Sequence, residues 1–102
     1  MEKTNKHDIT SMITISLFDH TNRTLQEALA IHPETNGLGI VTVYDYKYGY
    51  LIFCYDSLET LEDHKKAIAP EIYPLMHYAQ EHNCQWLRLD DDGPVMNDLP
   101  TY

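Results

Sequence analysis

The chain has 102 residues, of which 43% are hydrophobic, so we expect one folded domain with a single core rather than a disordered chain. Sixteen acidic against seven basic residues give a formal net charge of −9, and residues 56–102 contain ten of the acidic and three of the basic residues. Direct binding to nucleic acid needs clustered Lys and Arg and is therefore disfavoured, whereas a basic protein surface is a suitable partner.

The sequence also argues against export and membrane anchoring. No apolar run approaches the length needed to cross a bilayer, and residues 1–8 are polar with no apolar signal core behind them. Cys54 and Cys84 are too few for a secreted disulfide scaffold and lack metal-site spacing. We therefore expect a cytoplasmic protein with two reduced thiols.

The first half of the chain contains signals for one strand, one helix and a hairpin. Apolar and hydroxyl residues alternate over 12–17, as in a strand covered on one face. Thr24 and Glu27 have capping-box spacing and predict a helix that stops before Pro33. We also expect a turn at Asn36-Gly37.

Two β-branched and aromatic runs follow this turn, at residues 39–45 and 50–55. They predict a β-hairpin in which Gly49 supplies a positive φ.

The second half predicts a broken helix and a last strand. Asp56 is placed to cap a helical stripe that runs on to Asn83, and Pro70 and Pro74 should divide it into two pieces. Residues 85–89 alternate again and end at an acidic turn.

The predicted order is β-α-β-β-α-β, which favours an α+β fold with a ferredoxin-like two-layer sandwich. We expect a single domain over 1–102, with a flexible N-terminus at 1–9 and an irregular tail at 93–102.

An acidic turn, Asp90-Asp91-Asp92-Gly93, follows the last strand and is our first choice for a functional surface. It is similar to the Asp-x-Asp-Gly loop of phosphotransferases, but ten residues after Asp92 cannot supply the other parts of such an enzyme. The spacing of an EF-hand fails as well, because Val95 and Thr101 occupy its Gly and Glu positions. A solvated turn and a recognition patch for a basic partner both remain open.

Signals for catalysis or for bound cofactors are weak throughout the chain. The six histidines lack ligand spacing, the four glycines form no phosphate loop, and no Ser or Cys occupies a nucleophile elbow. We expect a non-enzymatic protein without cofactor or metal.

Alternation along the strands predicts a second candidate surface. With the aliphatic residues on one face of the sheet, the other face carries Thr42, Tyr44, Tyr46, Trp86 and Arg88. This face could be a homodimer interface or a protein contact, or its aromatic residues could simply pack across the strands.

The C-terminal part of the sequence resembles a known family. Residues 84–95, Cys-Gln-Trp-Leu-Arg-Leu-Asp-Asp-Asp-Gly-Pro-Val, and 99–102, Leu-Pro-Thr-Tyr, are similar to the C-terminal signature of an uncharacterised family of small acidic proteins. Those proteins are carried by bacteria, phages and plasmids. The resemblance implies an accessory role on a mobile element and no particular activity.

We thus predict a mobile-element inhibitor or modulator of a host nucleic-acid-handling protein, such as a restriction or CRISPR effector. Carboxylates would occupy its basic groove in place of phosphates. The residues assigned to this contact are Asp90, Asp91, Asp92, Asp98, Glu59, Glu62 and Asp63. The alternative is a self-associating adaptor that pairs through the aromatic face.

Overall fold

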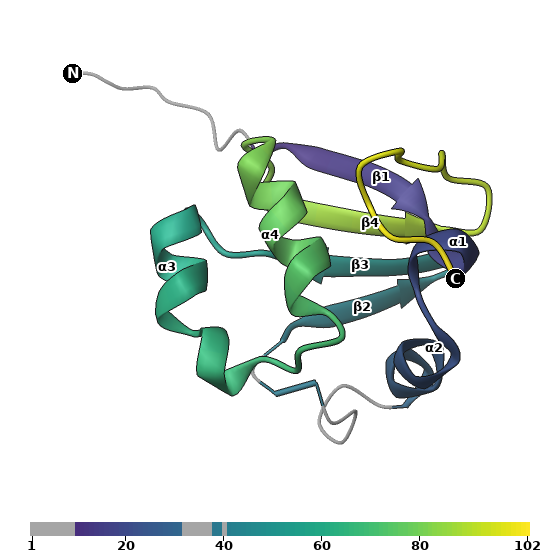
Figure 1. The fold of residues 1–102 in the computed structure, drawn as a ribbon, viewed down its shortest axis with the longest axis horizontal. Helices are drawn as coiled ribbons and strands as arrows, with labels where there is room; N and C mark the ends of the chain where they lie inside the picture. The colour runs from purple at the N-terminus through teal and green to yellow at the C-terminus, as the bar shows by residue number, and fades with distance from the viewer. Residues whose placement is uncertain (1–9, 32–37, 40) are drawn as a thin grey trace.

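The computed structural model describes residues 10–31, 38–39 and 41–102 (Figure 1). Its sheet has four strands in the order β1-β4-β3-β2. The central β4 runs parallel to β1 and antiparallel to β3, and β3 forms an antiparallel hairpin with β2. The bounds are Met12–Ser16 for β1, Val43–Tyr46 for β2, Gly49–Phe53 for β3 and Trp86–Asp90 for β4.

The α+β class is confirmed, but the ferredoxin-like order is not. A ferredoxin-like sheet places β1 beside β3, whereas here β4 lies between them. The physical reason is that alternation specifies which face of a strand is buried and leaves its neighbours undetermined. Leu87 and Leu89 of β4 are both 0% exposed, consistent with the central position of this strand.

The helices differ from the sequence prediction mainly at their starts. A short α1, Leu17–His20, follows β1 directly and is capped by Ser16. Helix α2, Arg23–Ala30, is capped by the side chain of Asn22, which lies among the cap candidates at residues 21–24, whereas the capping-box spacing of Thr24 and Glu27 is not used as a cap. The sequence predicts Asp56 as the cap of the next helix, but the cap is Ser57, whose hydroxyl accepts a hydrogen bond from the Thr60 N–H. Asp56 and Ser57 are adjacent and both are good capping residues, so spacing alone could not decide between them.

The predicted break in the second helical region is confirmed. Helix α3 covers Leu58–Asp63, a 3₁₀ turn, η2, covers Lys65–Ala67, and α4 covers Tyr73–Glu81. Pro70 lies in the gap, and Pro74 falls in the first turn of α4, where a missing N–H is tolerated.

The hairpin is confirmed, with strands shorter than the apolar runs. Val43 pairs with Ile52 and Tyr46 with Gly49 across a two-residue turn. A Cβ at Gly49 would lie 1.8 Å from the carbonyl oxygen of Leu89, so close strand approach explains this glycine. The predicted turn at Asn36-Gly37 and residues 1–9 lie outside the described residues.

One face of the sheet is covered and contains the core. In Figure 1, α4 crosses in front of the central strands, and its buried residues join those of the sheet. Ile15, Ile52 and Leu87 are 0% exposed on this face. The helical layer therefore buries only one side of the sheet.

The C-terminal segment, residues 93–102, forms no helix or strand but is firmly bound. His20, which is 2% exposed, contacts it through both ring nitrogens. Nδ1 lies 2.8 Å from the Pro100 carbonyl oxygen, and Nε2 accepts from the Met96 N–H at 2.8 Å. This pair of contacts requires the neutral tautomer with its proton on Nδ1, so the imidazole joins α1 to the segment.

Candidate functional site

The face of the sheet opposite the helical layer carries half-buried and exposed side chains. Strand register sets these residues in rows, for example Thr14 beside Arg88, Arg88 beside Leu51 and Leu51 beside Tyr44. Apart from Ser16 at the end of β1, which is buried, none of the strand residues on this face falls in the buried class, in contrast to the core face. We call this surface the open face; it consists of Met12, Thr14, Tyr44, Tyr46, Leu51, Phe53, Trp86, Arg88 and Asp90.

Aromatic rings form the centre of the open face. The Trp86 ring centroid lies 6.1 Å from that of Tyr44 and 5.3 Å from that of Phe53, both in tilted arrangements. Tyr44 is 56% exposed. Cross-strand packing therefore accounts for part of this cluster and leaves apolar ring surface facing solvent.

The sequence identified four members of this face, Tyr44, Tyr46, Trp86 and Arg88, and missed others. Phe53 and Leu51 belong to it as well. Alternation within the second hairpin strand places residues 51 and 53 on one side of the sheet. The strand is a continuous apolar run, however, and this run conceals the alternation. Thr42 lies just outside β2 and is exposed.

Polar pairs close the face at its two margins. The Tyr46 hydroxyl donates to Oδ2 of Asp90, and Arg88 Nε donates to Thr14 Oγ1 at 2.9 Å. Burial, followed by the hydrogen bond to Asp90, raises the pKa of Tyr46 to about 12. The same hydroxyl, and then the Asp92 N–H, lower the pKa of the Asp90 carboxyl, which stays ionised. Arg88 and Asp90 are thus held in place at the rim of the aromatic centre.

The acidic turn borders the open face. One carboxylate oxygen from each of Asp90, Asp91 and Asp92 lies within 4.8 Å of the others. Desolvation, then repulsion from Asp92 and Asp90, raises the pKa of Asp91. Calcium takes six to eight oxygen ligands, and Asp90 already receives the Tyr46 hydroxyl and the Asp92 N–H. Two exposed carboxylates and one half-buried carboxylate that already accepts two hydrogen bonds are a weak basis for a metal site.

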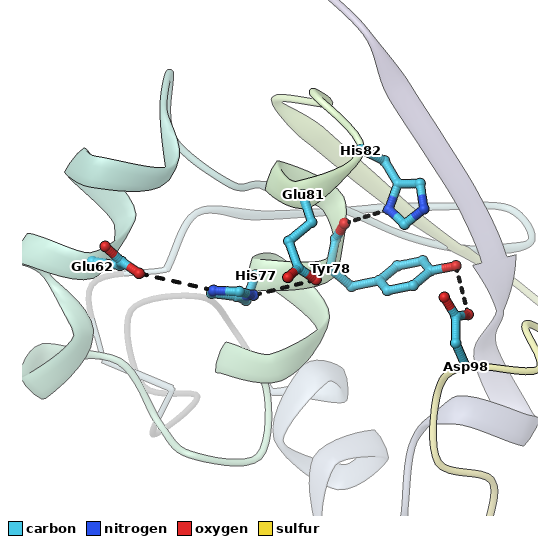
Figure 2. Close-up of polar contacts among 6 residues, drawn as sticks. All are labelled: Glu62, His77, Tyr78, Glu81, His82 and Asp98. Carbon is cyan, nitrogen blue, oxygen red and sulfur yellow. Dashed lines mark hydrogen bonds and ion pairs between the residues drawn. The ribbon is translucent and has the colours of Figure 1, made fainter.

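The remaining predicted acidic residues lie elsewhere. Glu59, Glu62 and Asp63 belong to α3, beyond the end of the sheet opposite to the acidic turn (Figure 1). Glu62 contacts His77 of α4, with 3.9 Å between Oε2 and Nε2, and His77 also contacts Glu81 (Figure 2). The structure therefore separates the α3 carboxylates from the turn.

Asp98 belongs to a third location. It accepts a hydrogen bond from the Tyr78 hydroxyl of α4 at 3.0 Å, as Figure 2 shows. This contact fastens the C-terminal segment to the helical layer, on the other side of the sheet from the aromatic cluster. The seven carboxylates predicted as one contact are thus distributed over three places, and only those of the turn adjoin the open face.

These features define a small α+β protein with a four-stranded mixed sheet, one face of which is aromatic and is covered by none of the described helices. The chain belongs to the Family of unknown function (DUF5983), whose C-terminal domain model matches residues 12–102. The expected membership of an uncharacterised family is thereby confirmed. No curated protein and no solved structure matches the chain. Within the described residues, no helix is both long and apolar enough to cross a membrane.

Proposed function

We propose that this protein is a non-enzymatic binding module that docks on a basic protein surface through the open face and the adjoining acidic turn. The observation that carries the proposal is the exposure of the open face, on which Tyr44 is 56% and Met12 43% exposed. Aromatic residues and Met are enriched where proteins bind one another, and contiguous apolar surface of this kind marks interaction sites.

The size of the face supports a contact that extends beyond it. Four strands about 4.8 Å apart, with five residues rising about 3.3 Å each, give a flat area on the order of 300 Å². A standard interface buries roughly 800 Å² per partner. Neighbouring surface must therefore contribute, and the acidic turn is the polar surface next to the aromatic centre.

Charge favours a basic partner. The chain has a net charge of −9, and the turn concentrates three carboxylates at one margin of the face. Such a field attracts positive surfaces and repels nucleic acid. Basic grooves are characteristic of proteins that handle nucleic acid, so we infer an inhibitor or modulator of such a protein, in the cytoplasm of a bacterial host that carries a mobile element. The mobile-element context rests on the sequence resemblance alone.

The test is affinity capture from bacterial lysate at low and high salt, with three forms of the protein. The first is the unchanged chain, and the second has Asn at the three carboxylates of the turn, Asp90, Asp91 and Asp92. The third is the matched control, with Gln at Glu59 and Glu62 and Asn at Asp63. We expect a nucleic-acid-handling partner that is lost at high salt and with the second form and retained by the control. Equal capture by the second form would refute the role of the turn.

Self-association through the same face is the second candidate, favoured by the exposure of the aromatic cluster. It predicts a dimer that Tyr44→Ser weakens. Light scattering at high protein concentration tests self-association, since a strictly monomeric protein would exclude this candidate.

A further inference from the structure

A small cavity opens where the hairpin turn meets α1 and the segment that follows β4. Its volume is about 270 Å³. Ligand pockets for whole small molecules begin at about 300 Å³, so this space suits a single side chain better. We call it the turn cavity, and the lining residues that matter here are Phe18, Asp45, Lys47, Tyr48, Tyr50 and Asp91.

Aromatic rings and carboxylates line the turn cavity together. Phe18 is 58% and Tyr48 48% exposed, so both rings present surface that the fold leaves unburied. Asp45 and Asp91 are exposed as well. A ring face attracts cations through its quadrupole, and a carboxylate attracts them by charge, so the lining is complementary to a positive group.

The chain's own lysine makes a contact of this kind. Lys47 Nζ lies 5.4 Å from the centroid of the Tyr48 ring, within the range of a cation–π contact. Lys47 is exposed, so another cation would compete with its ammonium for the ring.

Backbone contacts hold the walls of the cavity in register. The Asp91 N–H donates to the Tyr48 carbonyl at 2.9 Å, and Asp45 pairs with Tyr50 across the hairpin. Desolvation, followed by repulsion from Asp92 and Asp90, raises the pKa of the Asp91 carboxyl. A cation placed beside Asp91 would relieve this repulsion.

We propose that the turn cavity binds an arginine side chain of the protein partner. The inference rests on the proposed function and specifies the partner's chemistry. A guanidinium is planar, stacks on aromatic rings and donates to carboxylates from a rigid fork, whereas an ammonium is a compact and strongly hydrated charge. Rings beside two carboxylates therefore favour arginine over lysine.

The test is an amide NMR titration of the full chain with N-acetyl-arginine amide, with the lysine and norleucine analogues as parallel ligands. We expect saturable shifts confined to Phe18, residues 45–50 and Asp91, strongest with arginine. Asp45→Asn with Asp91→Asn should weaken binding about fivefold. Lys47→Gln should tighten it, because the competing cation is gone.

The control variant is Glu59→Gln with Asp63→Asn, which removes the same charge from α3 and should leave binding unchanged. Equal shifts with lysine, or an equal loss in the control, would overturn the assignment.

The two proposals fail separately. If arginine produces no local shifts while capture of a partner still depends on the open face, only the arginine site falls. Binding of arginine without any captured partner would instead remove the proposed function.

Discussion

Replacement of His20 tests how the C-terminal segment is held. His20→Leu replaces the imidazole with an apolar side chain of similar size and so removes both of its hydrogen bonds. The Met96 N–H and the Pro100 carbonyl then lack their partner. Because His20 is 2% exposed, water does not readily replace the ring. At about 1 to 1.5 kcal/mol for each hydrogen bond, the free energy of unfolding should fall by roughly 2–3 kcal/mol.

Urea and thermal unfolding measure this loss. For a domain of this size, 2–3 kcal/mol corresponds to a fall in Tm of roughly 10–20 °C. Hydrogen exchange at the Met96 amide should also accelerate, because its acceptor is gone. The matched control is His82→Leu: His82 is exposed and its Nδ1 lies 2.9 Å from the Tyr78 carbonyl oxygen, so water can substitute there. A loss below about 0.5 kcal/mol in His20→Leu, no larger than in the control, would refute the reasoning.

Three further predictions concern the sheet and the thiols. Gly49→Ala places a methyl group 1.8 Å from the Leu89 carbonyl oxygen and should destabilise the protein by about 2–3 kcal/mol in urea unfolding; a neutral effect would contradict the strand approach. The pKa of Tyr46 is raised to about 12, so its contribution to stability should be complete below pH 10 and lost as the pH rises through 12; Tyr46→Phe should flatten that part of the pH–stability curve. Burial raises the pKa of Cys54 to about 12, so iodoacetamide should modify only the half-buried Cys84 in the native protein, as mass spectrometry would reveal.

Local patterns predicted most of the elements because each rests on neighbouring residues. Alternation located the strands, and Pro70 located the break in the second helical region. Helix α1 was missed, although Ser16 and Asp19 have the spacing of a cap and the Ser16 hydroxyl accepts from the Asp19 N–H. The apolar alternation up to Leu17 favoured one longer strand and concealed this signal.

Sheet order and the fastening of the C-terminal segment depend on residues far apart in sequence. The parallel pairing of β1 with β4 joins segments separated by most of the chain, and His20 meets Pro100 across a similar separation. No pattern around His20 indicates a buried imidazole with two backbone partners. For the candidate site, alternation identified the aromatic face. Alternation could not predict that the α3 carboxylates and Asp98 lie apart from the acidic turn, because this depends on the strand order and on the path of the C-terminal segment.

The measurement that tests the central claim most directly is the affinity of a captured partner for two matched variants, determined by isothermal titration. Tyr44→Ser removes an exposed ring from the open face, and Ile31→Ser removes a 47% exposed apolar side chain just after α2. Binding through the open face predicts at least about tenfold weaker affinity for Tyr44→Ser and unchanged affinity for Ile31→Ser. Equal affinities for both variants and the unchanged protein would contradict it.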